Sequence, residues 1–239
     1  MHINLLRKKF LKIQEKSKNK YAINFLNKLL ETRYVYHFDW FGVPTIQFPS
    51  DLMVIQDLIF RSKPDIIIET GVAHGGSLIF YSSLLSLLKV KNYKIIGIDI
   101  KIKKENRKKI LNSKVSKNIE LIETSSVNLE TFKKLKLKTK NKRVLVILDS
   151  NHSESHVFEE LEMFSKLIKK NNYIVVMDTS IEFINQKFIN RGREFGKGNS
   201  PYTAVKKFIK KNKKFKIDKS YENKSFISSC YSGFLKRIS

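Results

Sequence analysis

Residues 66–77 read Ile-Ile-Ile-Glu-Thr-Gly-Val-Ala-His-Gly-Gly-Ser, an apolar run that leads through a glycine-rich turn into a helical stretch. Glycines allow the backbone to approach a ligand closely, and the start of a helix favours anionic groups. In an open α/β sheet, ligands bind beyond the carboxyl ends of the strands. The turn therefore predicts a nucleoside-cofactor site, with Gly71, His74, Gly75 and Ser77 in contact with the ligand. A tight connection without a ligand is the less favoured alternative, because glycines are dense here.

The same alternation of short apolar runs and helical stretches continues along the chain. Buried parallel strands are short and continuously apolar, and helices between them repeat apolar residues at helical spacing. We therefore predict an α/β fold with a doubly wound, mostly parallel sheet and an antiparallel edge, which is a Rossmann-like architecture. The predicted parallel strands are residues 65–70, 94–99, 119–123, 143–149 and 173–178, the main helices include residues 77–88, 153–169 and 201–211, and residues 215–221 and 226–234 are candidates for the antiparallel edge.

The chain is expected to begin with a helical extension, residues 1–33, followed by the main domain, residues 34–239. Within the extension, apolar residues such as Ile3, Leu6 and Phe10 recur at helical spacing with basic residues between them. Such a helix packs on its own domain or on a second copy of the chain. Peripheral contact with an anionic membrane surface is the minority hypothesis.

Two serines mark expected helix starts. Ser50 is predicted to be the N-cap of a helix that has Asp51 in its first turn. Ser200 is predicted to cap the helix that begins at Pro201, since proline is well suited to the first helical position.

Composition limits the class of protein. The 239 residues carry a formal net charge of +25 and contain a single cysteine, Cys230, so no disulfide can form within the chain. A reducing cytoplasm is the expected compartment, and the longest apolar runs are too short to cross a bilayer. The charge allows an anionic partner, but the lysines are spread along the chain without an RNA-binding or zinc-ligand pattern. A basic nucleic-acid-binding module is therefore a less favoured alternative than an enzyme.

Polar residues follow the predicted strands at one edge of the sheet. Glu69 precedes the first glycine by two residues, where its carboxylate suits an ammonium group such as that of S-adenosylmethionine. Asp99 ends the second strand, where an acidic residue can accept hydrogen bonds from both ribose hydroxyls. Ser125 and Ser126 follow the third strand and are expected to meet the adenine. The absence of G-x-G-x-x-G spacing disfavours an NAD-binding or nucleotide-sugar-binding enzyme, the main enzymatic alternative.

Asp149 and Asp178 follow the fourth and fifth strands. Their carboxylates could hold Mg²⁺ through oxygen ligands, orient a substrate, or cap the helices that follow. His152 is a candidate general base because its ordinary pKa lies near neutrality, and a structural histidine is the rival interpretation. His156 is expected to be structural.

The chain resembles the cephalosporin hydroxylase / rhamnosyl O-methyltransferase family from about Tyr34 to its C-terminus. Several motifs, which together are fairly specific, carry the resemblance: Trp40-Phe41-Gly42-Val43-Pro44, Pro49-Ser50-Asp51, the turn at residues 69–77, Leu148-Asp149-Ser150-Asn151-His152, Asp178-Thr179, Ser200-Pro201-Tyr202-Thr203-Ala204-Val205 and Phe215-Lys216-Ile217-Asp218.

The resemblance implies a class I methyltransferase fold, S-adenosylmethionine as cofactor and methyl transfer to a hydroxyl. It also implies Mg²⁺ near the acceptor, held by Asp149 and Asp178, with Asp149 beside the cofactor and in the catalytic set. His152 matches the family's histidine. An acidic residue is usual just before Asp178, and this chain has Met177 there. The expected acceptor is a sugar, as in surface polysaccharide synthesis, or a small metabolite, with residues 180–200 as the acceptor loop.

Overall fold

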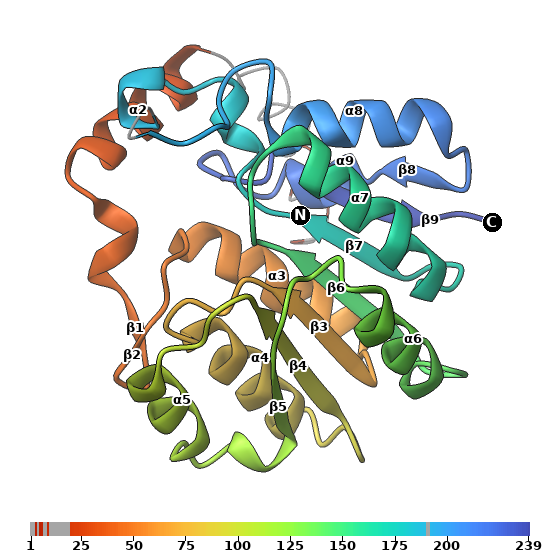
Figure 1. Cartoon of the computed structure of the whole chain (residues 1–239). Helices are drawn as coiled ribbons and strands as arrows, with labels where there is room; N and C mark the ends of the chain where they lie inside the picture. The colour runs from red at the N-terminus through yellow and green to blue at the C-terminus, as the bar shows by residue number, and fades with distance from the viewer. Residues whose placement is uncertain (1–2, 4, 7–8, 10–19, 190–191) are drawn as a thin grey trace.

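The computed structural model describes residues 3, 5–6, 9, 20–189 and 192–239. Its strands are β1 (Asp39–Trp40), β2 (Val43–Pro44), β3 (Ile66–Thr70), β4 (Lys94–Asp99), β5 (Ile119–Glu123), β6 (Val144–Leu148), β7 (Tyr173–Val176), β8 (Phe215–Ile217) and β9 (Phe234–Arg237). Strands β1 and β2 form a small hairpin, and the others form one sheet in the order β5-β4-β3-β6-β7-β9-β8 (Figure 1). Strands β3 to β7 are parallel, and β9 is antiparallel to both of its neighbours.

Helices cover both faces of this sheet. They are α2 (Lys20–Glu31), α3 (Pro49–Ser62), α4 (Gly76–Leu87), α5 (Lys104–Leu111), α6 (Leu129–Lys138), α7 (Glu154–Phe164), α8 (Pro201–Lys211) and α9 (Lys219–Glu222), with short 3-10 turns η1 (Tyr34–His37), η2 (Ser116–Asn118), η3 (Ser165–Leu167), η4 (Thr179–Glu182) and η5 (Gln186–Phe188). In β6, Leu145 and Ile147 belong to the core that contains α3 and α4, whereas Val144 and Val146 belong to the core that contains α6, α7 and α8. Burial on both faces explains why the strands read as continuous apolar runs.

The doubly wound architecture with an antiparallel edge is therefore confirmed, and β4 and β5 have the predicted bounds. The edge itself differs from the prediction. Residues 219–222 form α9 because Asp218 caps that helix by accepting a hydrogen bond from Ser220 N. Residues 226–233 are irregular, and β9 begins only at Phe234.

Of the two predicted N-caps, only Ser200 is correct. Its Oγ accepts a hydrogen bond from Thr203 N in a capping box. Helix α3 begins at Pro49, one residue before Ser50, because the fixed φ of proline suits the first helical position. Ser50 instead donates through Oγ to the carbonyl of Ile227 at 2.6 Å.

Asp51, in the first turn of α3, is fully buried and joins this helix to the irregular C-terminal segment. Its carboxylate accepts hydrogen bonds from Ser228 Oγ at 2.6 Å, Ser229 N at 2.7 Å and Ser229 Oγ at 2.9 Å. The carbonyl of Ser229 in turn accepts from Ser180 N at 2.9 Å and Thr179 Oγ1 at 3.1 Å. Asp51 thus helps to fix the turn that follows Asp178.

The N-terminal extension is described only in part. Helix α2 lies beside η5, where Asn185 N donates to Asn27 Oδ1 at 2.8 Å (Figure 1). Phe10 and most of the expected amphipathic helix lie outside the described residues. Contact with a membrane and a domain boundary at residue 34 therefore stay predictions.

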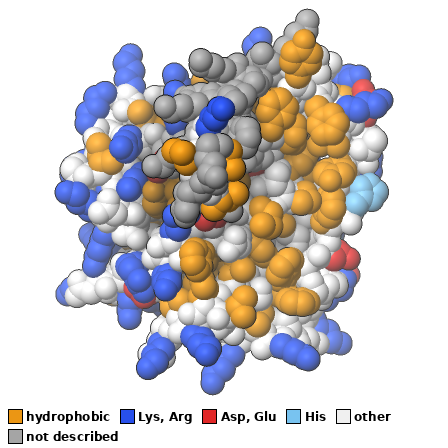
Figure 2. Space-filling model, turned by 180° about the vertical axis from the view of Figure 1, so that it is seen from behind, with side chains coloured by type: hydrophobic (Ala, Val, Ile, Leu, Met, Phe, Trp, Pro, Cys, Tyr) orange, Lys and Arg blue, Asp and Glu red, His pale blue; other side chains and the backbone are white. Residues whose placement is uncertain are grey.

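The high net charge is spread over the surface rather than gathered in one patch of the face shown in Figure 2. Figure 2 shows Lys and Arg side chains spread around the rim of one face, with hydrophobic side chains grouped between them. Within the part of the chain that the structure describes, no helix has the length and apolar character needed to cross a bilayer.

We expect Asp51→Asn to lower the free energy of unfolding by about 2 kcal/mol, because an amide cannot accept all three hydrogen bonds and a buried donor is left unpaired. Urea denaturation of the full chain measures the change. Asp39→Asn, at an exposed position, is the matched control. Equal unfolding midpoints for the two variants would show that the Asp51 contacts contribute little.

Candidate functional site

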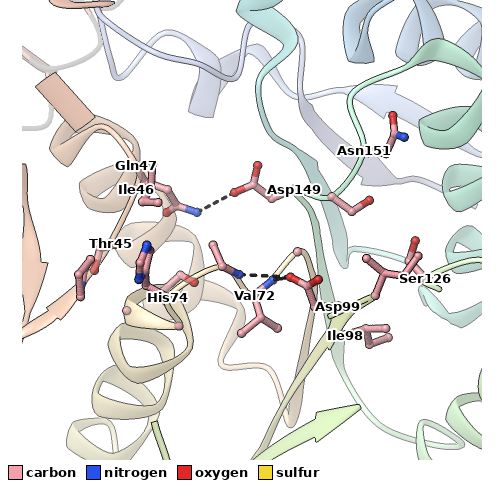
Figure 3. Close-up of a pocket in the computed structure, with 18 of the residues that line it drawn as sticks. Thr45, Ile46, Gln47, Val72, His74, Ile98, Asp99, Ser126, Asp149 and Asn151 are labelled. Carbon is pink, nitrogen blue, oxygen red and sulfur yellow. Dashed lines mark hydrogen bonds between the residues drawn. The ribbon is translucent and has the colours of Figure 1, made fainter. Parts of the chain in front are cut away.

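A cavity of about 360 Å³ opens where β3, β4 and β6 end (Figure 3). This volume lies in the range of small-molecule sites, roughly 300–1,000 Å³. Seven of the predicted cofactor residues line it: Gly71, His74, Gly75, Ser77, Asp99, Ser125 and Asp149. The glycine-rich turn, the end of the second parallel strand and the end of the fourth thus meet around one space.

The backbone conformation at position 71, which lines the cavity, requires a glycine. The φ of Gly71 is +87°, and a Cβ added to it would lie 2.0 Å from the carbonyl oxygen of Asp149. Gly75 has a φ of +86°, and an added Cβ would lie 2.2 Å from Cδ1 of Ile110 on α5. Any other residue at either position would be strained and would push the turn away from its neighbours.

Asp99 holds the glycine-rich turn while facing the cavity. Its Oδ2 accepts hydrogen bonds from Val72 N at 2.8 Å and Ala73 N at 3.3 Å, and its Oδ1 accepts from Lys101 N at 3.0 Å. A carboxylate has about four acceptor positions, so capacity remains for a ligand hydroxyl. The carboxylate therefore shapes the turn as well as lining the cavity.

Glu69 does not line the cavity, which differs from its expected role as a direct contact. It is fully buried, with Ser77 Oγ donating to Oε2 at 2.6 Å and Tyr81 OH donating to Oε1 at 2.9 Å. Its carboxyl faces α4 because side chains alternate along β3, which puts Glu69 on the same face as Ile67. Burial raises its pKa to about 8. Glu69 therefore orients Ser77, which does line the cavity.

The segment after the β1–β2 hairpin forms a wall that the sequence analysis did not assign. Gln47 Nε2 donates to Asp149 Oδ2 at 3.3 Å (Figure 3). A Cβ added to Gly76 would lie 2.1 Å from Thr45 Oγ1, so this segment packs tightly against the start of α4. The quoted motif Trp40–Pro44 pointed to the segment, but nothing in the spacing indicated that Gln47 would reach Asp149.

The far wall contains a second unassigned contact. Ser126 Oγ lies 2.9 Å from Nε2 of His156, and both residues line the cavity. His156 was expected to be structural. Its position on α7, four residues after His152, is the only signal that could have suggested a place near the site.

A second cavity of about 330 Å³ adjoins the first. Ile46, Gln47 and Asp149 line both cavities, so the two meet at the end of β6. The second cavity has apolar walls from α2 and from the expected acceptor loop, including Leu26, Leu30, Ile181, Ile184, Phe188 and Ile189. His152 and Asp178 lie on its floor beside Asp149, so the predicted catalytic and metal residues are brought together here.

These three side chains form a compact polar cluster. His152 Nε2 lies 3.6 Å from Asp149 Oδ1 and 3.5 Å from Asp178 Oδ2. Burial lowers the pKa of His152, but the two carboxylates raise it, and the net direction is upward. One ligand atom from each residue lies within 4.8 Å of the other two, an arrangement that could hold a metal ion.

Met177 contributes no ligand to this cluster. Its side chain is only 2% exposed, and its Sδ accepts a hydrogen bond from Cys230 Sγ at 3.3 Å. A thioether is a soft ligand that suits neither Mg²⁺ nor Ca²⁺. The departure at this position therefore leaves two carboxylates and one imidazole as the donors.

We predict that stability falls with rising pH across the range set by Glu69. Its pKa rises from 4.5 to about 8 on folding, so between these values the folded chain holds a proton that the unfolded chain has lost. The free energy of unfolding should drop by about 3 kcal/mol more in the native protein than in Glu69→Gln between pH 5 and pH 8. Urea denaturation at both pH values tests this, and parallel pH profiles would contradict it.

Comparison with known proteins adds a family to this geometry. Residues 32–238 match the family model of rhamnosyl O-methyltransferase/CmcI. The chain is 28% identical to the rhamnosyl O-methyltransferase of Mycobacterium bovis (strain BCG / Pasteur 1173P2) over 204 residues, which cover 83% of this chain and 77% of the relative. The rhamnosyl O-methyltransferase of Mycobacterium leprae (strain TN) is 26% identical over 202 residues, covering 83% and 82%.

Solved structures of CmcI share the fold. An apo form superimposes with a TM-score of 0.59 and 20% identity, covering 85% of this chain and 77% of the other. A CmcI complex with Mg and SAM gives a TM-score of 0.59 and 20% identity, covering 85% and 78%. The class I methyltransferase fold is thereby confirmed. Because the family model spans most of the chain, the resemblance carried by the motifs is confirmed too, and the chain belongs to the rhamnosyl O-methyltransferase/CmcI family.

Proposed function

We propose that the protein is an S-adenosylmethionine-dependent O-methyltransferase that acts on a sugar hydroxyl. The observation that carries the proposal is the junction of two cavities at Asp149. One cavity has the turn and carboxylate that suit a nucleoside, and the other has a polar cluster under apolar walls. Membership of the family supports the reaction, and the rhamnosyl O-methyltransferase relatives support a sugar acceptor. CmcI complexes with SAM and with SAH support the cofactor.

In this proposal the first cavity holds the cofactor, which supplies the methyl group when bound. Asp99 accepts hydrogen bonds from the ribose, and Ser125 and Ser126 face the adenine. His74 lies across the cavity from Ser126, with Asp99 between them (Figure 3). Ser77, oriented by Glu69, faces the methionine part.

The second cavity receives the acceptor. Apolar side chains line it together with Arg33 and Arg193, and the shared residues Ile46, Gln47 and Asp149 border the route between acceptor oxygen and methyl group. Holding two reactants in line at such a junction supplies much of the rate acceleration in a displacement reaction. Gln47 fixes the orientation of Asp149 by donating to its Oδ2.

The acceptor hydroxyl must lose its proton, and the cluster of Asp149, His152 and Asp178 is the place where this occurs. His152 Nε2 can accept the proton directly, with the two carboxylates stabilising the imidazolium that results. A divalent cation at Asp149 and Asp178 would offer a second route by lowering the pKa of a hydroxyl bound to it. Both routes place the acceptor oxygen beside Asp149.

The wider setting follows from the same proposal. The name of the relatives supports a rhamnosyl acceptor, and a part in surface polysaccharide or glycolipid synthesis stays a prediction. A cytoplasmic location, assembly with a second copy and contact with an anionic membrane stay predictions. The enzymatic alternative, an NAD-binding or nucleotide-sugar-binding protein, has no support from the family match.

Titration calorimetry with S-adenosylhomocysteine tests the cofactor site. We expect micromolar binding by the native chain and a loss of about tenfold or more in Asp99→Ala, since that change removes the ribose acceptor and loosens the turn. Glu105→Ala, at an exposed position on α5, is the control and should bind normally. Absence of binding by the native chain, or binding of NAD instead, would refute the proposal.

The acceptor is tested by transfer of labelled methyl from S-adenosylmethionine to a panel of rhamnosyl glycosides, with catechol as a small-metabolite comparison. Labelled rhamnoside is the expected product. Transfer to catechol alone would replace the sugar acceptor with a small metabolite and leave the cofactor assignment intact.

A further inference from the structure

The cluster of Asp149, His152 and Asp178 brings one imidazole nitrogen and two carboxylate oxygens within 4.8 Å of one another. The His152 Nε2 distances to the two carboxylate oxygens, 3.6 and 3.5 Å, are too long for hydrogen bonds. Protein ligands at about 2.0–2.2 Å from a metal ion stand roughly 3–3.5 Å apart from one another. The two distances from His152 Nε2 are therefore close to the spacing of atoms that share a metal ion.

The donor nitrogen is left without a partner. Nε2 of His152 is buried and has no hydrogen-bond partner among the described residues. A buried polar atom without a hydrogen bond destabilises the fold, so such atoms are rare unless a ligand or ion binds to them. Asp149 is arranged in a complementary way, because Gln47 engages its Oδ2 and leaves Oδ1 facing His152.

The surrounding backbone holds the cluster in place. Asp178 has a φ of 54°, a left-handed conformation that a non-glycine residue rarely adopts. Ser229 supports the next residues through the hydrogen bonds to Thr179 and Ser180.

The residue directly before Asp178 affects which donor atoms the cluster contains. Met177 is packed against Cys230 and offers no oxygen. Mg²⁺ prefers a set of oxygen ligands, whereas an imidazole nitrogen suits first-row transition metals. Two carboxylate oxygens and one imidazole nitrogen are therefore a poor match for Mg²⁺ and a good match for Mn²⁺, Co²⁺ or Zn²⁺.

We infer that His152 is a metal ligand in this chain, and that the acceptor site binds a first-row transition-metal ion in preference to Mg²⁺. The inference rests on the proposed function, since the metal would serve the acceptor hydroxyl. It assigns His152 to holding the ion rather than to taking the proton. Met177 then determines which metal the enzyme uses.

Metal binding by the chelator-treated full chain tests this directly. Calorimetry should show Mn²⁺ binding about tenfold or more tighter than Mg²⁺, and pulsed EPR of bound Mn²⁺ should detect one nitrogen ligand. In His152→Ala the nitrogen signal should disappear and Mn²⁺ affinity should fall about tenfold, with little change for Mg²⁺. His37→Ala, at an exposed histidine, should behave as the native protein does. Met177→Glu should strengthen Mg²⁺ binding and lower the ratio of Mn²⁺ affinity to Mg²⁺ affinity.

Unchanged Mn²⁺ affinity in His152→Ala, no nitrogen signal in the native protein, or equal affinity for both metals would overturn the inference. S-adenosylhomocysteine binding is measured on the same samples. If it persists while the metal results fail, the metal assignment is wrong and the methyltransferase proposal stands. If Met177→Glu proves unstable in thermal unfolding, the His152→Ala comparison still decides the question.

Discussion

The site depends on the close approach of three strand ends at Gly71. The Gly71 N–H donates to the carbonyl of Ile98 at 2.8 Å, and Asp149 N donates to the carbonyl of Thr70 at 2.9 Å. No side chain fits between Gly71 and the Asp149 carbonyl, since a Cβ would come within 2.0 Å. This contact, together with the two hydrogen bonds, helps to set how far the carboxylate of Asp99 stands from Asp149. The distance between the two cavities, which we propose for cofactor and acceptor, therefore follows from backbone packing in the sheet.

Side chains from the two ends of the sequence then complete a site that the central strands only begin. Gln47 lies 102 residues before Asp149 and fixes one of its oxygens. Asp51, in the first turn of α3, accepts a hydrogen bond from Ser229, and the carbonyl of Ser229 accepts one from Thr179, which follows Asp178. Helix α3 and the irregular C-terminal segment therefore both hold the turn after Asp178. Because these supports are distant in sequence and buried, we expect changes in them to alter the geometry of the cluster through small shifts. A displacement of about 1 Å can reduce a reaction rate by about two orders of magnitude.

The sequence was sufficient for the fold because its parallel strands are buried on both faces and read as continuous apolar runs. It also located many of the residues that line the first cavity, since the polar residues at the ends of β3, β4 and β6 must meet at one edge of the sheet. It failed where the outcome depends on the direction of a side chain. Glu69 was expected to contact the ligand, but its carboxylate accepts hydrogen bonds from Ser77 and Tyr81 of α4. Gln47 and the Ser126–His156 contact could not be found, because contacts between separate segments leave no spacing signal in one sequence.

Three aspartates line the two cavities although the whole chain is strongly basic. The formal net charge is +25, yet Asp99, Asp149 and Asp178 line the two adjoining cavities, and Arg33 and Arg193 also line the second. Surface charges act weakly beyond about 8 Å at physiological ionic strength, so lysines spread over the surface do not set the potential inside a cavity. The ligands proposed here, a sulfonium cofactor and a divalent metal, are cations and require such carboxylates. Net charge therefore describes the surface of this protein, whereas the character of the candidate site follows from the aspartates that line its two cavities.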